Sequence, residues 1–78
     1  MIYPSDEELM KDFGKRIKFL RKKYKLTQSE LAGKAELEKT AIQRIERGYN
    51  STLKTLRKLA NAFEISLSEL CDIKIDEV

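Results

Sequence analysis

A pattern that begins α-helices recurs along this 78-residue chain and limits its fold more than any other feature. In segments 26–31 (LTQSEL) and 65–70 (ISLSEL), an apolar residue precedes a hydroxyl residue, and Glu followed by Leu completes the pattern. The hydroxyl and the carboxylate bind free amides of a first helical turn, while the flanking apolar side chains pack together. Segment 37–42 (LEKTAI) has the same apolar spacing, but its Glu38 is a poor cap. These closely spaced starts predict several short helices.

Two further helices follow from the same kind of evidence. Ser5 caps a long stripe of apolar residues that are spaced by three or four. Gly14 interrupts this first helix and indicates close packing against a neighbour. Ser51 and Thr52 precede another apolar stripe, after a stop at Gly48. The sequence therefore predicts an all-α fold of five helices, over about residues 6–24, 28–35, 39–47, 53–62 and 67–72.

Composition excludes several classes of protein. The chain has no His and a single Cys, so it lacks the usual general base, the commonest zinc ligand and an intrachain disulfide. No apolar run approaches the roughly 18 residues of a membrane-spanning helix. Carboxylates are abundant, but no pattern places a pair of them in a pocket. We therefore expect one domain over residues 1–78, cytoplasmic, without catalytic activity, metal, cofactor, small-molecule ligand or membrane partner.

Positive charge is concentrated in one segment. The formal net charge is only +3, yet residues 13–25 hold seven basic side chains and no acidic one. A basic block of this kind is usually a solvated face, but it also attracts phosphate backbones. Charge alone therefore leaves a nucleic-acid partner open.

The helices expected over 28–35 and 39–47 form the most informative pair. They are joined by a turn of about three residues, so they cross steeply and one flank of the second helix remains exposed. This is the helix-turn-helix geometry, whose second helix enters the major groove of DNA. All of the positions that must face inward are apolar: Leu31, Ala32, Ala35, Leu37, Ile42 and Ile45.

Several segments together carry a family resemblance. The sequence resembles the Cro and lambdoid-repressor type helix-turn-helix family (XRE-like), over about residues 13–72. The resemblance implies a bacterial or phage transcription regulator, a restriction-modification controller or an antitoxin, usually a dimer on its operator. The matching segments are 13–17 (FGKRI), 26–32 (LTQSELA), 42–48 (IQRIERG) and 66–70 (SLSEL).

The helix over 39–47 carries side chains suited to base edges. With its two isoleucines facing inward, a rotation of 100° per residue turns polar side chains outward. Arg44 can pair with guanine, Gln43 with adenine, and Thr40 can contact a thymine methyl group. The resemblance adds readers at the helix start, although Glu36 and Glu38 depart from the family's turn glycine and cap. The expected base-reading residues are Glu38, Lys39, Thr40, Gln43 and Arg44.

Further residues are expected to contact the DNA backbone. The amides at the start of the helix over 28–35 can hold a phosphate, and the resemblance makes Gln28 a contact to that phosphate or a support for the base-reading residues. Basic side chains of the first helix and residues after the helix over 39–47 are further candidates. The alternative for the segment from Thr40 to Arg47 is that it merely forms a solvated face. The expected set is Thr27, Gln28, Ser29, Lys15, Arg16, Arg47, Tyr49, Asn50 and Ser51, with Lys18 beside them.

Glu46 lies on the inward side of its helix. Its angular position is close to that of Ile42, and a buried carboxylate without a partner is unfavourable. The family resemblance supplies Arg21 of the first helix as the partner. We therefore expect Arg21 and Glu46 to form a structural ion pair rather than to contact DNA.

The expected function is sequence-specific binding of double-stranded DNA by a transcriptional regulator such as a repressor. One short helix reads few base pairs, so we expect a homodimer on palindromic operators. Leu67, Leu70, Ile73 and Ile75 in the last helix and tail form the expected dimer surface. Cys71 is expected to be a small buried residue, with redox sensing or an intersubunit disulfide as alternatives. The rival function is an antitoxin or other protein-interaction module with secondary DNA binding.

Overall fold

The computed structural model describes residues 3 and 5–73, and these form five α-helices. The predicted all-α fold and the order of its helices are confirmed. The bounds of the first four helices agree with those expected to within one residue. The fifth ends two residues earlier than expected, and the amide of Asp72 donates to the carbonyl of Glu69 just after it. The helices are α1 (Asp6–Lys23), α2 (Gln28–Ala35), α3 (Lys39–Glu46), α4 (Leu53–Phe63) and α5 (Leu67–Leu70).

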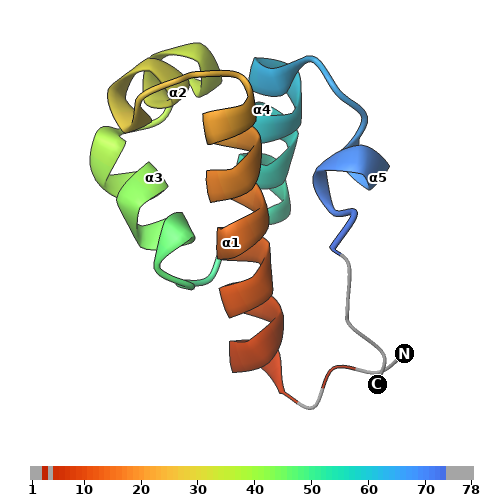
Figure 1. The fold of residues 1–78 in the computed structure, drawn as a ribbon. Coiled ribbons are helices and arrows are strands. Elements are labelled where there is room, and N and C mark those ends of the chain that lie inside the picture. The colour runs from red at the N-terminus through yellow and green to blue at the C-terminus, as the bar shows by residue number, and fades with distance from the viewer. Residues whose placement is uncertain (1–2, 4, 74–78) are drawn as a thin grey trace.

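The long helix α1 separates the other helices into two sides (Figure 1). α3 lies on one side of α1 and α5 on the other, with α2 near the end of α1. α3 packs against both α1 and α2, and α4 packs against α2 and α5. The second and third helices therefore form one unit that is supported from behind by α1 and α4.

One hydrophobic core joins all five helices. Five of the six inward positions expected in the unit of α2 and α3 are buried, and Leu37 is half-buried against the core. Removing these side chains from water is the main force that stabilises the fold. The buried apolar residues are Phe13, Ile17, Leu20, Leu31, Ala32, Ala35, Ile42, Ile45, Leu59, Ala60, Phe63 and Leu70.

Four helices begin at a hydroxyl side chain that accepts a hydrogen bond from the amide three residues later: Ser5, Thr27, Thr52 and Ser66. At Thr27 the capping box is complete, because Glu30 Oε1 accepts from the Thr27 amide at 2.8 Å. This hydrogen bond lowers the pKa of Glu30. Glu38 precedes α3 without a side-chain capping bond, in agreement with its poor capping ability.

Four helices end with the same backbone motif, in which one residue adopts the left-handed conformation. These left-handed residues are Lys25, Glu36, Gly48 and Glu64, with φ of 58°, 55°, 95° and 57°. In each case the amide of the next residue donates to the carbonyl five residues earlier. The bonds run from Leu26 to Arg21, Leu37 to Ala32, Tyr49 to Arg44 and Ile65 to Ala60. The donor residue is apolar and partly buried after α1, α2 and α4, but after α3 it is the exposed Tyr49.

Two expectations for the C-terminal region are wrong. Leu70, expected on a dimer surface, is 0% exposed and belongs to the core. Cys71, expected to be buried, is exposed, because the short α5 turns Leu70 inward and ends at that residue. Partial burial nevertheless raises the pKa of the Cys71 thiol. Leu67 is 43% exposed, and Ile75 lies outside the described residues.

Candidate nucleic-acid interface

A tight turn at Glu36 and Leu37 joins α2 to α3. Leu37 donates its amide to the carbonyl of Ala32 at 2.9 Å and packs against the core. Glu36 has a φ of 55°, the left-handed conformation that glycine adopts without penalty. An L-residue there costs roughly 1 to 2 kcal/mol. The backbone of Glu36 therefore takes the conformation of the turn glycine that it replaces.

The inner side of α3 is fixed against α1. Ile42 and Ile45 are buried in the core, with 0% and 4% exposure. A Cβ atom added to Gly14 of α1 would overlap the carbonyl oxygen of Ile45 and lie 3.0 Å from that of Glu46. The two helices approach each other this closely because residue 14 has no side chain. The close packing predicted from Gly14 is confirmed.

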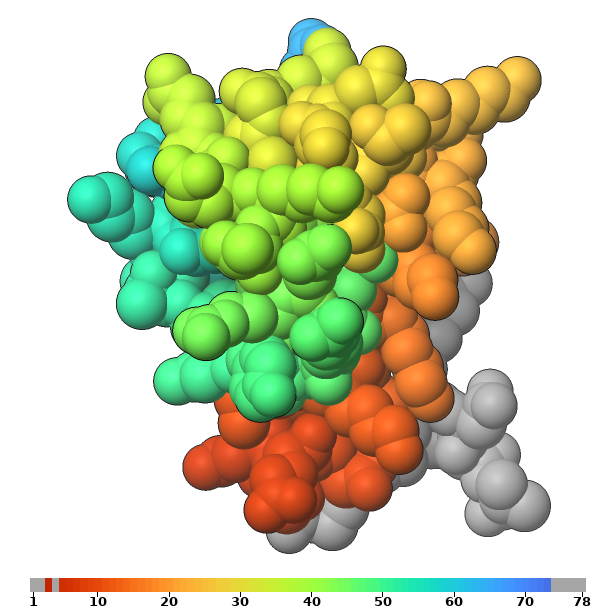
Figure 2. All heavy atoms as spheres, turned by 90° about the vertical axis from the view of Figure 1, so that its left-hand side faces the viewer, coloured from red at the N-terminus to blue at the C-terminus, as the bar shows by residue number. Residues whose placement is uncertain are grey.

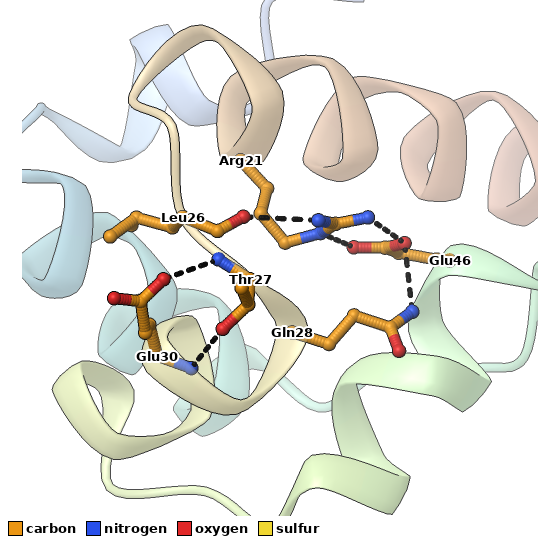
Figure 3. A network of polar contacts seen from close by, with 6 residues as sticks. All are labelled: Arg21, Leu26, Thr27, Gln28, Glu30 and Glu46. Atoms are coloured by element: carbon orange, nitrogen blue, oxygen red, sulfur yellow. Dashed lines mark hydrogen bonds and ion pairs between the residues drawn. The ribbon is translucent and has the colours of Figure 1, made fainter.

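An ion pair between Arg21 of α1 and Glu46 of α3 joins the same two helices (Figure 3). Arg21 Nε donates to Glu46 Oε2 at 2.7 Å, and Nη2 donates to Oε1 at 3.1 Å. Arg21 Nη1 also donates to the carbonyl of Leu26 at 3.0 Å. The two charged side chains are only 12% and 6% exposed, and the hydrogen bond to Glu46 raises the pKa of Arg21. Both groups therefore belong to the scaffold that holds α3.

Gln28, in the first turn of α2, extends this network. Its Nε2 donates to Glu46 Oε1 at 3.2 Å, and its side chain is half-buried (Figure 3). The hydrogen bond ties the start of α2 to the end of α3, and this link is not predicted from the sequence. The partners are 18 residues apart on different helices, so no local spacing signals the contact.

The outer side of α3 is open to solvent. Figure 2 shows α3 across the middle of one face of the molecule, bordered by α2 and by the start of α1. Gln43 is half-buried, and Arg47, directly after the helix, is exposed. Because Arg21 neutralises Glu46, positive charge predominates on this side. The other expected base-reading residues are all exposed: Glu38, Lys39, Thr40 and Arg44.

The expected backbone contacts near α3 differ in their accessibility. Tyr49 and Asn50 are exposed, whereas the Oγ atom of Ser51 is buried. At the start of α2, Ser29 is exposed and the hydroxyl of Thr27 is engaged in capping. The start of α2 lies beside the end of α3, since Gln28 contacts Glu46 there. The structure therefore brings the first turn of α2 and the residues after α3 to the same region.

Lys15 and Arg16 are not brought to this region. Both line a groove that is completed by residues after α5, on the side of α1 away from α3. Arg16 Nη2 donates to the carbonyl of Glu69 at 2.8 Å. Arg21, in contrast, faces α3. The basic segment 13–25 is thus distributed around α1, because consecutive helical residues point in different directions.

Apart from Glu38 at its start, the outer side of α3 carries cations and neutral side chains that can donate hydrogen bonds, which suit base edges and phosphates. Over the described residues 3 and 5–73, no group of three or more His, Cys, Asp or Glu side chains is arranged to hold a metal ion. In the same part of the chain, no helix combines the length and the apolar character that crossing a membrane requires.

Two short helices joined by a tight turn, with the inner side of the second fixed and its outer side open, define a helix-turn-helix DNA-binding unit. Residues 17–70 match the helix-turn-helix family, and the chain belongs to this family. The resemblance to the Cro and lambdoid-repressor type that the sequence motifs carry is thereby confirmed.

Individual relatives come from phages and from restriction-modification systems. The chain is 47% identical to the immunity repressor protein of Bacillus phage phi105 over 58 residues, which are 73% of this chain and 40% of the relative. It therefore spans well under half of that protein. The restriction-modification controller protein C.AhdI from Aeromonas hydrophila shares 35% identity and a TM-score of 0.76, over 78% of this chain and 94% of that one. The wild-type controller protein C.Esp1396I shares 33% identity and a TM-score of 0.72, over 81% and 87% of the two chains.

Proposed function

We propose that the protein binds specific double-stranded DNA sequences through the outer side of α3 and regulates transcription as a homodimer on palindromic operators. The contrast between the two sides of α3 carries this proposal. Gly14, Arg21 and the core hold the inner side, while the outer side exposes hydrogen-bond donors and cations. A helix held in this way presents its outer side chains at constant positions, which base recognition requires.

The side chains of α3 have distinct roles in this proposal. Arg44 donates two hydrogen bonds to guanine, and Gln43 exchanges two with adenine. The methyl group of Thr40 contacts thymine, while Lys39 donates to guanine and Glu38 accepts from cytosine at the helix start. Each well-placed pair of hydrogen bonds discriminates against a wrong base by about 1 to 3 kcal/mol.

Phosphate contacts surround these base contacts. The first turn of α2, with Gln28 and Ser29, directs its amides at one phosphate, as helix N-termini do. Arg47, Tyr49 and Asn50 are exposed after α3 and contact another. Lys15 and Arg16 have no place in this set because they lie on the far side of α1, and the Ser51 hydroxyl is buried. The proposed backbone contacts are therefore the start of α2 and the exposed residues after α3.

The dimer follows from the small footprint of one recognition helix. Leu67 remains an apolar contact on α5, and half-buried Ile73 follows it, whereas Leu70 is part of the core. A two-fold axis near α5 places two copies of α3 in successive major grooves, about 34 Å apart.

Selection of bound duplexes from a random pool tests the function and the symmetry together. We expect recovery of two inverted half-sites with centres about one helical turn apart. Unrelated duplexes, or single half-sites without symmetry, would contradict the proposal. No detectable duplex binding at low salt would favour a protein-interaction module such as an antitoxin.

The selected duplex then allows the role of Arg44 to be measured. Affinity should fall steeply with salt, with a slope of about −0.9 per phosphate neutralised. Arg44→Ala should lose about 1 to 3 kcal/mol on the matched duplex and become indifferent to the base pair that Arg44 contacts. Lys23→Ala is the control on the far side of α1, because Lys23 lines the groove there without a hydrogen bond to α5, and its affinity should equal that of the wild type.

A further inference from the structure

Arg44 has an aromatic neighbour at the exposed end of α3. The guanidinium carbon lies 5.9 Å from the centre of the Tyr49 ring, within the range of a cation–π contact. Tyr49 is 57% exposed, so packing in the core does not explain why this residue is aromatic. Both side chains lie on the exposed surface at or directly after α3.

The backbone brings these two residues together. The amide of Tyr49 donates to the carbonyl of Arg44 at 3.0 Å, and the amide of Gly48 donates to that of Ile45 at 3.0 Å. In this helix-ending motif, the side chain after the left-handed residue contacts the side chain five residues earlier. After α2 and α4, the two residues in the places of that contact are apolar. After α3, the contact joins an aromatic ring to a guanidinium group.

The loop that carries the ring is itself held in place. Gly48 has a φ of 95°, and a Cβ atom added there would lie 3.3 Å from Cα of Lys11 in α1. Ile45, which accepts the Gly48 amide, is buried. The backbone directly before Tyr49 is therefore held in place. The Tyr49 ring in turn limits the directions that the Arg44 side chain can take.

We propose that Tyr49 is a positioning residue that orients Arg44 for base recognition and so determines specificity at one base pair. The inference rests on the proposed function, and it replaces the phosphate contact proposed there for Tyr49 with a positioning role. A free Arg side chain loses many rotamers when it binds a base. Stacking on the ring removes part of that loss before binding, which strengthens the specific contact alone.

Two substitutions separate the ring from the hydroxyl group. Tyr49→Phe keeps the aromatic face and removes the hydroxyl, whereas Tyr49→Leu keeps apolar bulk and removes the aromatic face. Affinities are measured on the selected duplex and on duplexes with the Arg44 base pair changed, that pair being the one to which Arg44→Ala becomes indifferent. We expect Tyr49→Leu to lose about twofold to fivefold on the matched duplex only. Tyr49→Phe should match the wild type on every duplex.

The Arg44→Ala background provides the control. In that background, Tyr49→Leu should cause no further loss of affinity. The double variant should have the same melting temperature as Arg44→Ala alone. If Tyr49→Leu discriminated between the matched and the changed duplexes as strongly as the wild type does, the inference would be overturned. An equal loss by Tyr49→Phe and Tyr49→Leu across all duplexes would also overturn it, in favour of a phosphate contact through the hydroxyl. If the wild type bound no duplex, the proposed function itself would fail, and this inference with it.

Discussion

The ends of α1 and α3 have the same backbone structure, but the arginine in one is nearly buried and the arginine in the other is exposed. Leu26 donates to the carbonyl of Arg21, and Tyr49 donates to that of Arg44, both at 3.0 Å. An arginine therefore occupies the same position in each motif. Arg21 turns inward to Glu46, and the two side chains are 12% and 6% exposed. Arg44 remains exposed beside the Tyr49 ring.

The surroundings, rather than the local motif, decide between these outcomes. Leu26 is partly buried and directly precedes Thr27, the cap of α2, so the chain turns back onto the core at once. Tyr49 is exposed and precedes Thr52, the cap of α4, by three residues. The longer connection leaves the end of α3 open to solvent. One local rule thus yields a stabilising arginine in α1 and an exposed arginine in α3, for which we propose base recognition.

The largest difference in stability should appear when each of the two arginines is replaced separately by alanine. Arg21→Ala leaves the 6% exposed Glu46 carboxylate without its partner and should destabilise the fold by about 3 to 5 kcal/mol. Arg44→Ala should change stability by no more than about 0.5 kcal/mol, because the side chain is exposed. Urea unfolding of both variants measures the difference. Equal unfolding midpoints for Arg21→Ala and the wild type would contradict the claim that Arg21 stabilises the fold.

A smaller effect should test how firmly α1 holds α3. Gly14→Ala places a methyl group against the carbonyl oxygens of Ile45 and Glu46 and should destabilise by about 1 to 3 kcal/mol. Gly33→Ala in α2 is the matched control, because an added Cβ meets no atom of the described residues within 4 Å. That variant should gain roughly 0.5 to 1 kcal/mol from helix propensity. Thermal unfolding should therefore show shifts of opposite sign, and a stabilised Gly14→Ala would contradict the close packing.

The smallest effect should distinguish the left-handed residues of the two motifs. Lys25 ends α1 with a φ of 58°, whereas Gly48 ends α3 with a φ of 95°. Lys25→Gly should stabilise by no more than about 1 kcal/mol, and Gly48→Ala should destabilise by about 1 to 2 kcal/mol. Calorimetry of both variants gives the comparison. Destabilisation by Lys25→Gly would show that the lysine side chain contributes more than its backbone strain removes.

The sequence predicts the helices well because their determinants are local. Capping hydroxyls and apolar spacing lie within a few residues of each helix start, so the starts at Ser5, Thr27 and Ser66 follow directly, and the start at Thr52 follows to within one residue. The inward positions of α2 and α3 follow from helical periodicity. Gly14 also signals its close contact, since a glycine inside a helix is unfavourable without a packing reason.

Features that depend on where side chains point in the folded protein are harder to predict from the sequence. Charge counted along residues 13–25 does not reveal that Arg16 and Arg21 point to different sides of α1. The four residues of α5 are too few for periodicity to show that Leu70 is buried. The pairing of Arg44 with Tyr49 has a detectable signal, a glycine between them at the spacing of the helix-ending motif. That signal becomes informative only once the end of α3 is known to be exposed.

The most direct test of the recognition surface is the change in backbone amide NMR shifts when the selected duplex is added to the ¹⁵N-labelled protein. We predict the largest changes in α3, in the first turn of α2 and at Tyr49 and Asn50. The groove lined by Lys15 and Arg16 should be unaffected. Changes concentrated in that groove, with α3 unperturbed, would contradict the assignment of the outer side of α3 as the DNA-binding surface.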